Sequence, residues 1–157
     1  LTYITSRGPW YQVSWKGNHE KSGGVATNIG IHFFDLLMWL FGPVGGIKVY
    51  HSDHERMSGF IELERARVRW FLSVDKNDLP QQVKTSGKTT YRSITVGGKE
   101  VEFSEGFTDL HTKVYEETLA GRGFGIKDAH PSVDLTHSIR QAPISPLDAL
   151  AHPFLKK

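Results

Sequence analysis

The sequence predicts an α+β domain in which antiparallel strands bury one face. Three observations point to this class: an apolar helical segment ends at Phe41, segments of alternating apolar and polar residues follow it, and two more helical segments come after those. Helices and strands in separate blocks are typical of α+β folds. At 157 residues with 38% hydrophobic content, the chain fits one domain with one core.

The N-terminal third predicts one short strand and one long helix. Residues 1–15 mix β-forming residues with Gly8 and Pro9, which indicates a short strand, an aromatic-rich turn and a loop. A helical pattern then runs from Ser22 to Phe41, and Gly42 stands where a C-terminal cap belongs.

The middle of the chain predicts strands with a two-residue period. Residues 47–54 are expected to form one strand, and residues 59–64 and 66–75 the next two. The glutamates Glu62 and Glu64 could pair with the arginines Arg67 and Arg69 across neighbouring strands. In residues 66–75, one face carries Val68, Trp70, Leu72 and Val74, and the other carries Arg67, Arg69 and Phe71. Such alternation indicates a sheet with one buried face.

The last third predicts a hairpin, two helices and an extended end. Residues 89–96 and 99–103 flank the two-glycine turn Gly97-Gly98. Helices are expected at about 110–120 and 132–141. Residues 143–157 contain three prolines and are interpreted as a tail or arm, so the domain proper spans residues 1–142.

Composition argues against several partners. The formal net charge is +2 and the basic residues are scattered, so no nucleic-acid partner is expected. No uninterrupted apolar run reaches the roughly 18 residues of a membrane span, so no membrane partner is expected. The absence of cysteine fits a cytoplasmic location. Without an initiating Met or a signal peptide, the start is expected to lie within a longer chain.

Other familiar sites are not indicated. His51 and His54 are three residues apart on a strand, where side chains point to opposite faces, so no metal site is predicted. The glycines between Gly121 and Gly125 follow a helix and read as a helix-ending loop, so no dinucleotide site is predicted here. No nucleophile-elbow pattern suggests a hydrolase.

The helix ending at Phe41 carries the polar side chains that could take part in binding or catalysis. At helical spacing, Asn28 and His32 share a face with Asp35 or Leu36. Gly23, Gly24 and Gly30 lower helix propensity, which suggests that something approaches this helix closely. Two interpretations stay open from the residues alone: a polar face lining a cleft, or a core histidine with Gly30 as a packing contact.

The pattern Gly23-Gly24, Asn28, Gly30, His32 and Asp35 resembles the signature of the glucose-fructose oxidoreductase and inositol dehydrogenase family (Gfo/Idh/MocA). The resemblance implies an open, mostly antiparallel sheet with helices on one face, as in the C-terminal domain of dihydrodipicolinate reductase. It also implies NAD or NADP bound by an N-terminal Rossmann domain outside this sequence, so no cofactor-binding residue is expected here. The family's catalytic lysine belongs to a Glu-Lys-Pro segment that the chain lacks.

The same resemblance implies roles for two residues. His32 matches the histidine that helps remove a proton from the reacting hydroxyl, a general-base role that suits imidazole at neutral pH. Asn28 stands where many members have aspartate. Because an amide cannot take a proton as a carboxylate does, Asn28 is expected to position substrate or histidine by hydrogen bonds.

The segments Tyr3–Tyr11, Ser14–Gly17 and Lys21–Gly30 are similar to a subgroup that oxidises UDP-N-acetylglucosaminuronic acid at its 3-hydroxyl, toward bacterial surface polysaccharides. In that subgroup asparagine is the usual residue at position 28. Residues expected to bind an anionic nucleotide sugar are the cations Arg7, Lys16 and Lys21 and the aromatic residues Trp10, Tyr11 and Trp15. Each could instead be a solvated cation or a packed aromatic.

Two other functions stay open: the same family acting on an inositol or a free aldose, and a non-catalytic sugar-binding or scaffold domain. The fragment alone is expected to be inactive because the cofactor half is missing. The family commonly assembles through the exposed face of the sheet. We therefore expect a homo-oligomer through the face carrying Arg67, Arg69 and Phe71.

Overall fold

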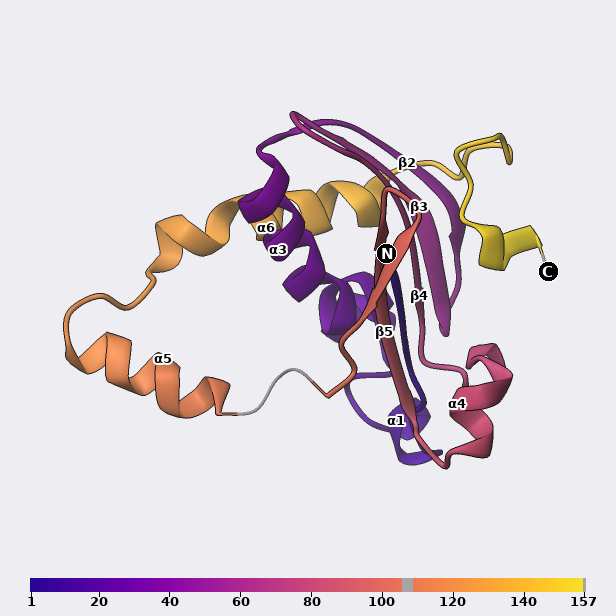
Figure 1. Ribbon diagram of the computed structural model, residues 1–157, viewed down its shortest axis with the longest axis horizontal. Helices are drawn as coiled ribbons and strands as arrows, with labels where there is room; N and C mark the ends of the chain where they lie inside the picture. The colour runs from indigo at the N-terminus through magenta and orange to yellow at the C-terminus, as the bar shows by residue number, and fades with distance from the viewer. Residues whose placement is uncertain (106–108, 157) are drawn as a thin grey trace.

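The computed structural model describes residues 1–105 and 109–156, which form a six-stranded sheet with the two helices Ile31–Phe41 and Ile126–Gln141 on one face (Figure 1). The short helix Gln81–Thr85 lies on the other face. The strands are β1 (Thr2–Thr5), β2 (Val44–Ser52), β3 (Arg56–Leu63), β4 (Arg67–Ser73), β5 (Thr90–Val96) and β6 (Lys99–Glu102). The α-helices are α1 (Trp10–Val13), α2 (His19–Ser22), α3 (Ile31–Phe41), α4 (Gln81–Thr85), α5 (Leu110–Leu119) and α6 (Ile126–Gln141).

The strands lie in the order β2-β3-β4-β1-β5-β6. The described pairs are antiparallel apart from β1 and β4, which run parallel. The predicted α+β class with an open, mostly antiparallel sheet is therefore confirmed. The expected pair of Glu62 and Arg67 also forms, at 3.9 Å on the surface.

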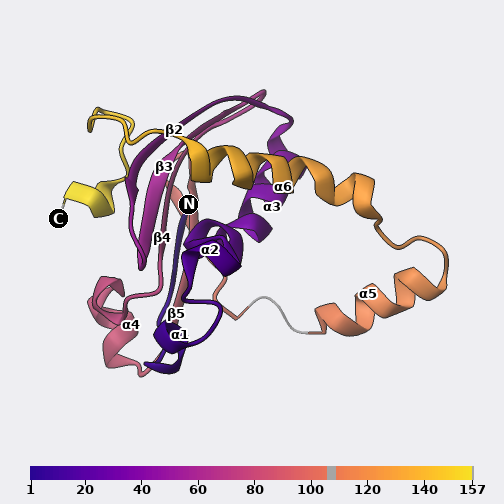
Figure 2. The same cartoon turned by 180° about the vertical axis from the view of Figure 1, so that it is seen from behind.

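The core lies between the sheet and the helices α3 and α6, which Figures 1 and 2 show side by side on one face. The core face predicted for residues 66–75 is confirmed, since Trp70, Leu72 and Val74 are buried there. The expectation of only one buried face was wrong, because Phe71 is buried on the other side. Phe34 of α3 meets Trp70 edge-on, with 5.4 Å between ring centroids. This packing fixes α3 across the sheet and leaves its other face free.

The helix predicted from Ser22 to Phe41 forms with an interruption at its start. Gly23 and Gly24 have positive φ, and residues Ala26–Gly30 form a π-helical turn that leads into α3. The predicted cap is confirmed, because the N–H of Gly42 donates to the carbonyl of Met38. A π-helix bonds residue i to i+5, so its turn is wider than that of an α-helix.

Gly30 lies where the helix approaches the sheet most closely. A Cβ at this position would lie 2.7 Å from Cδ1 of Leu72 and 2.9 Å from the ring of Phe34. The glycines suggested that something approaches this helix closely, and at Gly30 that neighbour is the sheet. The packing interpretation holds for this residue.

The same helical stretch is long and apolar enough to cross a membrane by length and composition alone. Within His19–Phe41, the most apolar 18 residues have a mean hydropathy of 1.3, and 44% of that stretch is buried inside the domain. Phe33, Phe34 and Leu37 pack into the core, so the apolarity has a structural cause here.

Two expectations about helix bounds were wrong. The segment expected as a turn and loop contains the short helices α1 and α2. Helix α6 begins at Ile126, not at residue 132, and continues through Pro131. The cap explains the earlier start, since the Asp128 carboxylate accepts a 2.7 Å hydrogen bond from the N–H of Gly125.

The C-terminal segment lies against the sheet face opposite α3 and α6 (Figures 1 and 2). Ile144 bridges to Val49, and Asp148 contacts Lys48 and Tyr50 of β2. The segment expected as a tail or arm is therefore an arm that packs on the domain as far as residue 156. Lys157 lies outside the described residues.

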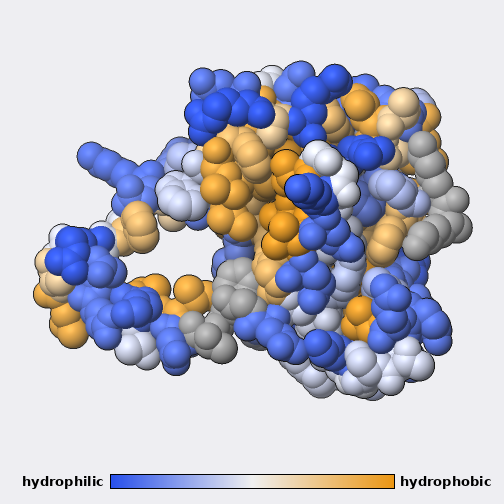
Figure 3. Space-filling model, in the orientation of Figure 1, coloured by the Kyte–Doolittle hydropathy of each residue, from blue (hydrophilic) through white to orange (hydrophobic). Residues whose placement is uncertain are grey.

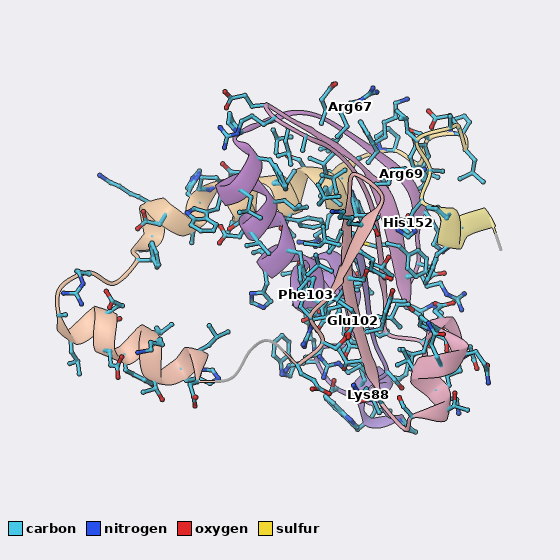
Figure 4. The ribbon with its side chains drawn as sticks, viewed as in Figure 1. Arg67, Arg69, Lys88, Glu102, Phe103 and His152 are labelled. Carbon is cyan, nitrogen blue, oxygen red and sulfur yellow. The ribbon has the colours of Figure 1, made fainter. Side chains whose placement is uncertain are left out.

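This arm changes the face expected for oligomerisation. Phe71 is only 2% exposed, because His152 stacks on its ring and Phe154 meets it edge-on. The expectation that Phe71 is open to a partner was wrong. Arg67 and Arg69 are exposed, and Figure 4 labels both with His152.

Candidate functional site

His32 projects from the free face of α3 into a cleft of about 890 Å³ between α3 and the start of α6. Its lining is mixed: α3 contributes Ile31, His32, Phe33, Asp35, Leu36, Met38 and Trp39, and the opposite wall consists of Phe124, Lys127, Asp128, Ala129, Pro131 and Ser132. The cleft is large enough for a small organic ligand.

The polar groups of this cleft are accessible. His32 and Asp35 are exposed, and neither side chain forms a hydrogen bond or ion pair within the described chain. The interpretation of His32 as a satisfied core histidine is therefore wrong. Its imidazole is free to contact a ligand in the cleft.

The cleft also exposes large apolar side chains. Trp39 is 79% exposed and Phe124 is 92% exposed, far more than core residues would be. Figure 3 shows apolar surface over the helical part of the domain that faces the opening beside α5. Helix α5 is exposed along its length, and the described lining of the cleft contains no residue from it.

Asn28 lies outside this cleft lining, although the sequence placed it on one face with His32. Its Nδ2 lies 2.9 Å from the carbonyl oxygen of Lys16, 3.0 Å from Oγ of Ser22 and 3.3 Å from Oη of Tyr11, so its two protons are shared among three acceptors. Its alignment with His32 on one helical face stays a prediction, while these hydrogen bonds turn its amide toward the segment that precedes the helix.

Tyr11 was expected to contact the substrate, but it lies in the core. Its side chain is 3% exposed, so the ring packs in the core and cannot stack on a ligand. Burial raises the pKa of Tyr11, while the Asn28 amide and the charge of Arg7 oppose that shift. The hydroxyl instead acts as a partner of Asn28.

The remaining predicted binding residues lie on the segment before the π-helical turn, outside the lining of the cleft. Arg7, Lys16 and Lys21 are exposed, and Trp10 and Trp15 are 52% and 60% exposed. Nζ of Lys16 lies 5.8 Å from the centroid of the Trp15 ring, a cation–π contact. These side chains are available to a ligand, and their roles stay predictions.

Sequence reasoning missed the second wall of the cleft. Phe124 and Lys127 were not singled out, because α6 was expected to start at residue 132. The signal that could have found them is Asp128 three residues after Gly125, a capping pattern that places Lys127 in the first turn. Within the described residues, no cluster of three or more His, Asp or Glu side chains could hold a metal ion.

Comparisons with known proteins match part of the chain by family model and nearly all of it by structure. A family model described as "Oxidoreductase family, C-terminal alpha/beta domain" matches residues 1–72. The WlbA (WbpB) dehydrogenase from Thermus thermophilus, solved in complex with NAD and α-ketoglutarate, is 54% identical with a TM-score of 0.93. The same dehydrogenase in complex with NAD and UDP-GlcNAcA is 52% identical with a TM-score of 0.92. Each match covers 98% of this chain and 50% of the other, so this chain spans half the length of those proteins.

Proposed function

The chain belongs to the Gfo/Idh/MocA oxidoreductases as their C-terminal α/β domain, and on that premise we propose that it is the substrate-binding half of an NAD-dependent sugar dehydrogenase. The proposed reaction is oxidation of the 3-hydroxyl of UDP-N-acetylglucosaminuronic acid. One observation carries the proposal: His32, unpaired among the described residues, lines a ligand-sized cleft of a domain 52% identical to one solved with that nucleotide sugar.

In this proposal His32 takes the proton of the reacting hydroxyl. An imidazole can accept a proton at neutral pH, and the exposed ring on α3 can approach a hydroxyl held in the cleft. When bound, NAD supplies the acceptor for the hydride that leaves the same carbon. The described residues offer no glycine-rich turn between a strand and a helix, so the dinucleotide would be held mainly by the other half of the protein.

The cleft offers one cation for an anionic substrate, beside the carboxylates of Asp35 and Asp128 that also line it. Lys127 lines it without an ion pair in the described part of the chain, and it can attract a carboxylate or diphosphate. One structure of the relative was solved with NAD and α-ketoglutarate, which is a dicarboxylate. We therefore propose that a 2-oxo diacid is an alternative ligand of this cleft.

Exposed apolar side chains favour the proposal that another domain of the full-length protein covers the cleft. They include Trp39 on α3, Val114 and Leu119 on α5, and Phe124 and Ile126 at the start of α6. A large contiguous apolar surface is typical of an interface. In the full-length protein this surface would meet the nucleotide-binding domain.

The cellular setting is also a proposal. We propose a cytoplasmic enzyme that supplies lipopolysaccharide O-antigen or another bacterial surface polysaccharide, because a nucleotide sugar is an activated donor for such polymers. We also propose a homo-oligomer that uses the sheet face around Arg67 and Arg69, two exposed cations beside the C-terminal arm. Sedimentation of the full-length protein tests that assembly.

The proposed function is tested by assaying the full-length protein for NADH formation. We expect turnover with UDP-N-acetylglucosaminuronic acid and none with UDP-glucose, inositol or a free aldose. Turnover with inositol or an aldose alone would place the enzyme elsewhere in the family. No turnover with any of these, together with tight UDP-sugar binding, would favour a non-catalytic binding domain.

A further inference from the structure

Two hydrogen-bond partners of Asn28, the Ser22 hydroxyl and the Lys16 carbonyl, have every donor and acceptor position occupied. Oγ of Ser22 donates to the carbonyl of Lys16 at 2.8 Å and accepts from the N–H of Gly24 and from Nδ2 of Asn28, both at 3.0 Å. A hydroxyl has one proton to donate and two lone pairs, so all three sites are occupied. The Lys16 carbonyl likewise uses both lone pairs, for Ser22 and Asn28.

This arrangement fixes which way the Asn28 amide faces. The Lys16 carbonyl can only accept, and the single Ser22 proton is already directed to it. The atom of Asn28 that faces both must therefore be the NH2 group. The amide oxygen, Oδ1, then lies on the other side and has no hydrogen-bond partner in the described chain.

A carboxylate at position 28 would not fit these partners. Its oxygen would lie about 2.9 Å from the Lys16 carbonyl oxygen, and two acceptors at that distance repel each other. Only the protonated acid could donate to that carbonyl. The surrounding residues are themselves held in place, since Ser22 is 7% exposed and Tyr11 is 3% exposed.

We propose that the Lys16 main-chain carbonyl selects an amide over a carboxylate at position 28 and, by holding the NH2 group, leaves Oδ1 as a fixed acceptor for the substrate contact that the family resemblance implies for Asn28. Ser22 and Tyr11 are the positioning residues that hold the amide. This inference rests on the proposed function for the identity of the substrate. The selection of the amide depends on this domain alone.

The first test is the Asn28→Asp variant of the full-length protein, labelled with carboxyl-13C aspartate. We expect one additional carboxyl signal that titrates above the usual range near 3.9, because the Lys16 carbonyl favours the protonated acid. Nearby cations oppose this shift. However, the side chain of Lys16 lies over Trp15, and Arg7 is solvent-exposed. An ordinary or lowered pKa for the introduced carboxyl would overturn the inference.

The second test is the pH dependence of the same variant with the UDP-sugar. The protonated carboxyl of Asn28→Asp imitates the amide, so the variant should lose affinity for the sugar as pH rises through the raised pKa of that carboxyl. The wild type should not show this loss, because its amide does not titrate. A variant whose KM for the sugar follows the wild-type pH profile would contradict the proposal. A raised pKa of the introduced carboxyl in a protein that oxidises no UDP-sugar would uphold the amide selection and reject the proposed function.

The third test removes the positioning hydroxyls. Ser22→Ala should raise KM for the sugar about tenfold and Tyr11→Phe about threefold, with KM for NAD unchanged. Matched controls are Ser58→Ala and Tyr50→Phe, which remove hydroxyls bonded to Trp70 and Asp148, away from Asn28. Equal effects on both Michaelis constants, or equal effects in the controls, would show a merely structural role.

Discussion

The hydroxyl of Tyr50 on β2 donates a 2.6 Å hydrogen bond to Asp148, which ties the C-terminal arm to the sheet. Nζ of Lys48 donates to the other carboxylate oxygen at 2.9 Å. The hydrogen bonds from Lys48 and Tyr50 hold the pKa of Asp148 at about 2. Burial, with the bond to Asp148, raises the pKa of Tyr50 to about 12. The arm is therefore anchored by an ionised carboxylate and a neutral phenol.

The anchor predicts how arm attachment depends on pH. Because the pKa of Asp148 is depressed in the folded chain, its contribution is present above the unfolded value near 3.9 and is lost as pH falls toward about 2. Because the pKa of Tyr50 is raised, its contribution is complete below about 10 and is lost as pH rises toward about 12.

Asp148→Asn should remove the acid-dependent part of this anchoring. We expect protease cleavage within residues 143–156 of the variant to vary less between pH 4 and pH 2 than in the wild type. An acid-stable protease such as pepsin provides the measurement. Glu20→Gln is the control, since Glu20 is exposed and has no ion pair in the described chain. The same acid response in Asp148→Asn and wild type would contradict the anchor.

His32→Ala should lower kcat of the full-length enzyme about 100- to 10,000-fold, the usual contribution of a general base. The exposed position of His32 means that folding should be unaffected. His54→Ala is the matched control, because that imidazole is also exposed but lies on the turn between β2 and β3. Steady-state kinetics with the UDP-sugar decides the question. A kcat within about twofold of wild type would reject His32 as the base.

Sequence patterns predicted the fold well because burial leaves a periodic signal. Trp70, Leu72 and Val74 alternate as expected and face the core. The site was harder to predict, because helical spacing does not show which neighbours bind a polar side chain: the Asn28 amide turns toward Lys16 and Ser22 of the preceding segment. Tyr11 was misplaced for a related reason: an aromatic residue in a polar segment looks the same whether it stacks on a ligand or packs inward.

Lys127→Ala should raise KM for the anionic sugar about five- to tenfold and make that KM less sensitive to salt. The reason is that its ammonium lines the cleft without an ion pair among the described residues, so the substrate is its natural counter-charge. Lys84→Ala on α4 is the control, because Lys84 is exposed and donates to the carbonyl of Asn77, away from the cleft. If both variants shift KM equally, Lys127 contributes only to overall charge.

Gly30→Ala should destabilise the domain by about 1–3 kcal/mol, the usual cost of overpacking a core. Alanine ordinarily favours a helix, so propensity alone predicts the opposite sign. Here the added Cβ would lie 2.7 Å from Leu72 and 2.9 Å from Phe34, and the helix would have to move off the sheet. Urea unfolding of the 157-residue chain measures the change.

Gly45→Ala is the control, because a Cβ there meets only the Glu62 carbonyl at 3.8 Å, an ordinary contact. Because His32 lies two residues further along the same helix, a shifted α3 should also lower kcat in the full-length enzyme. A stabilised Gly30→Ala variant would mean that the helix stands further from the sheet than described.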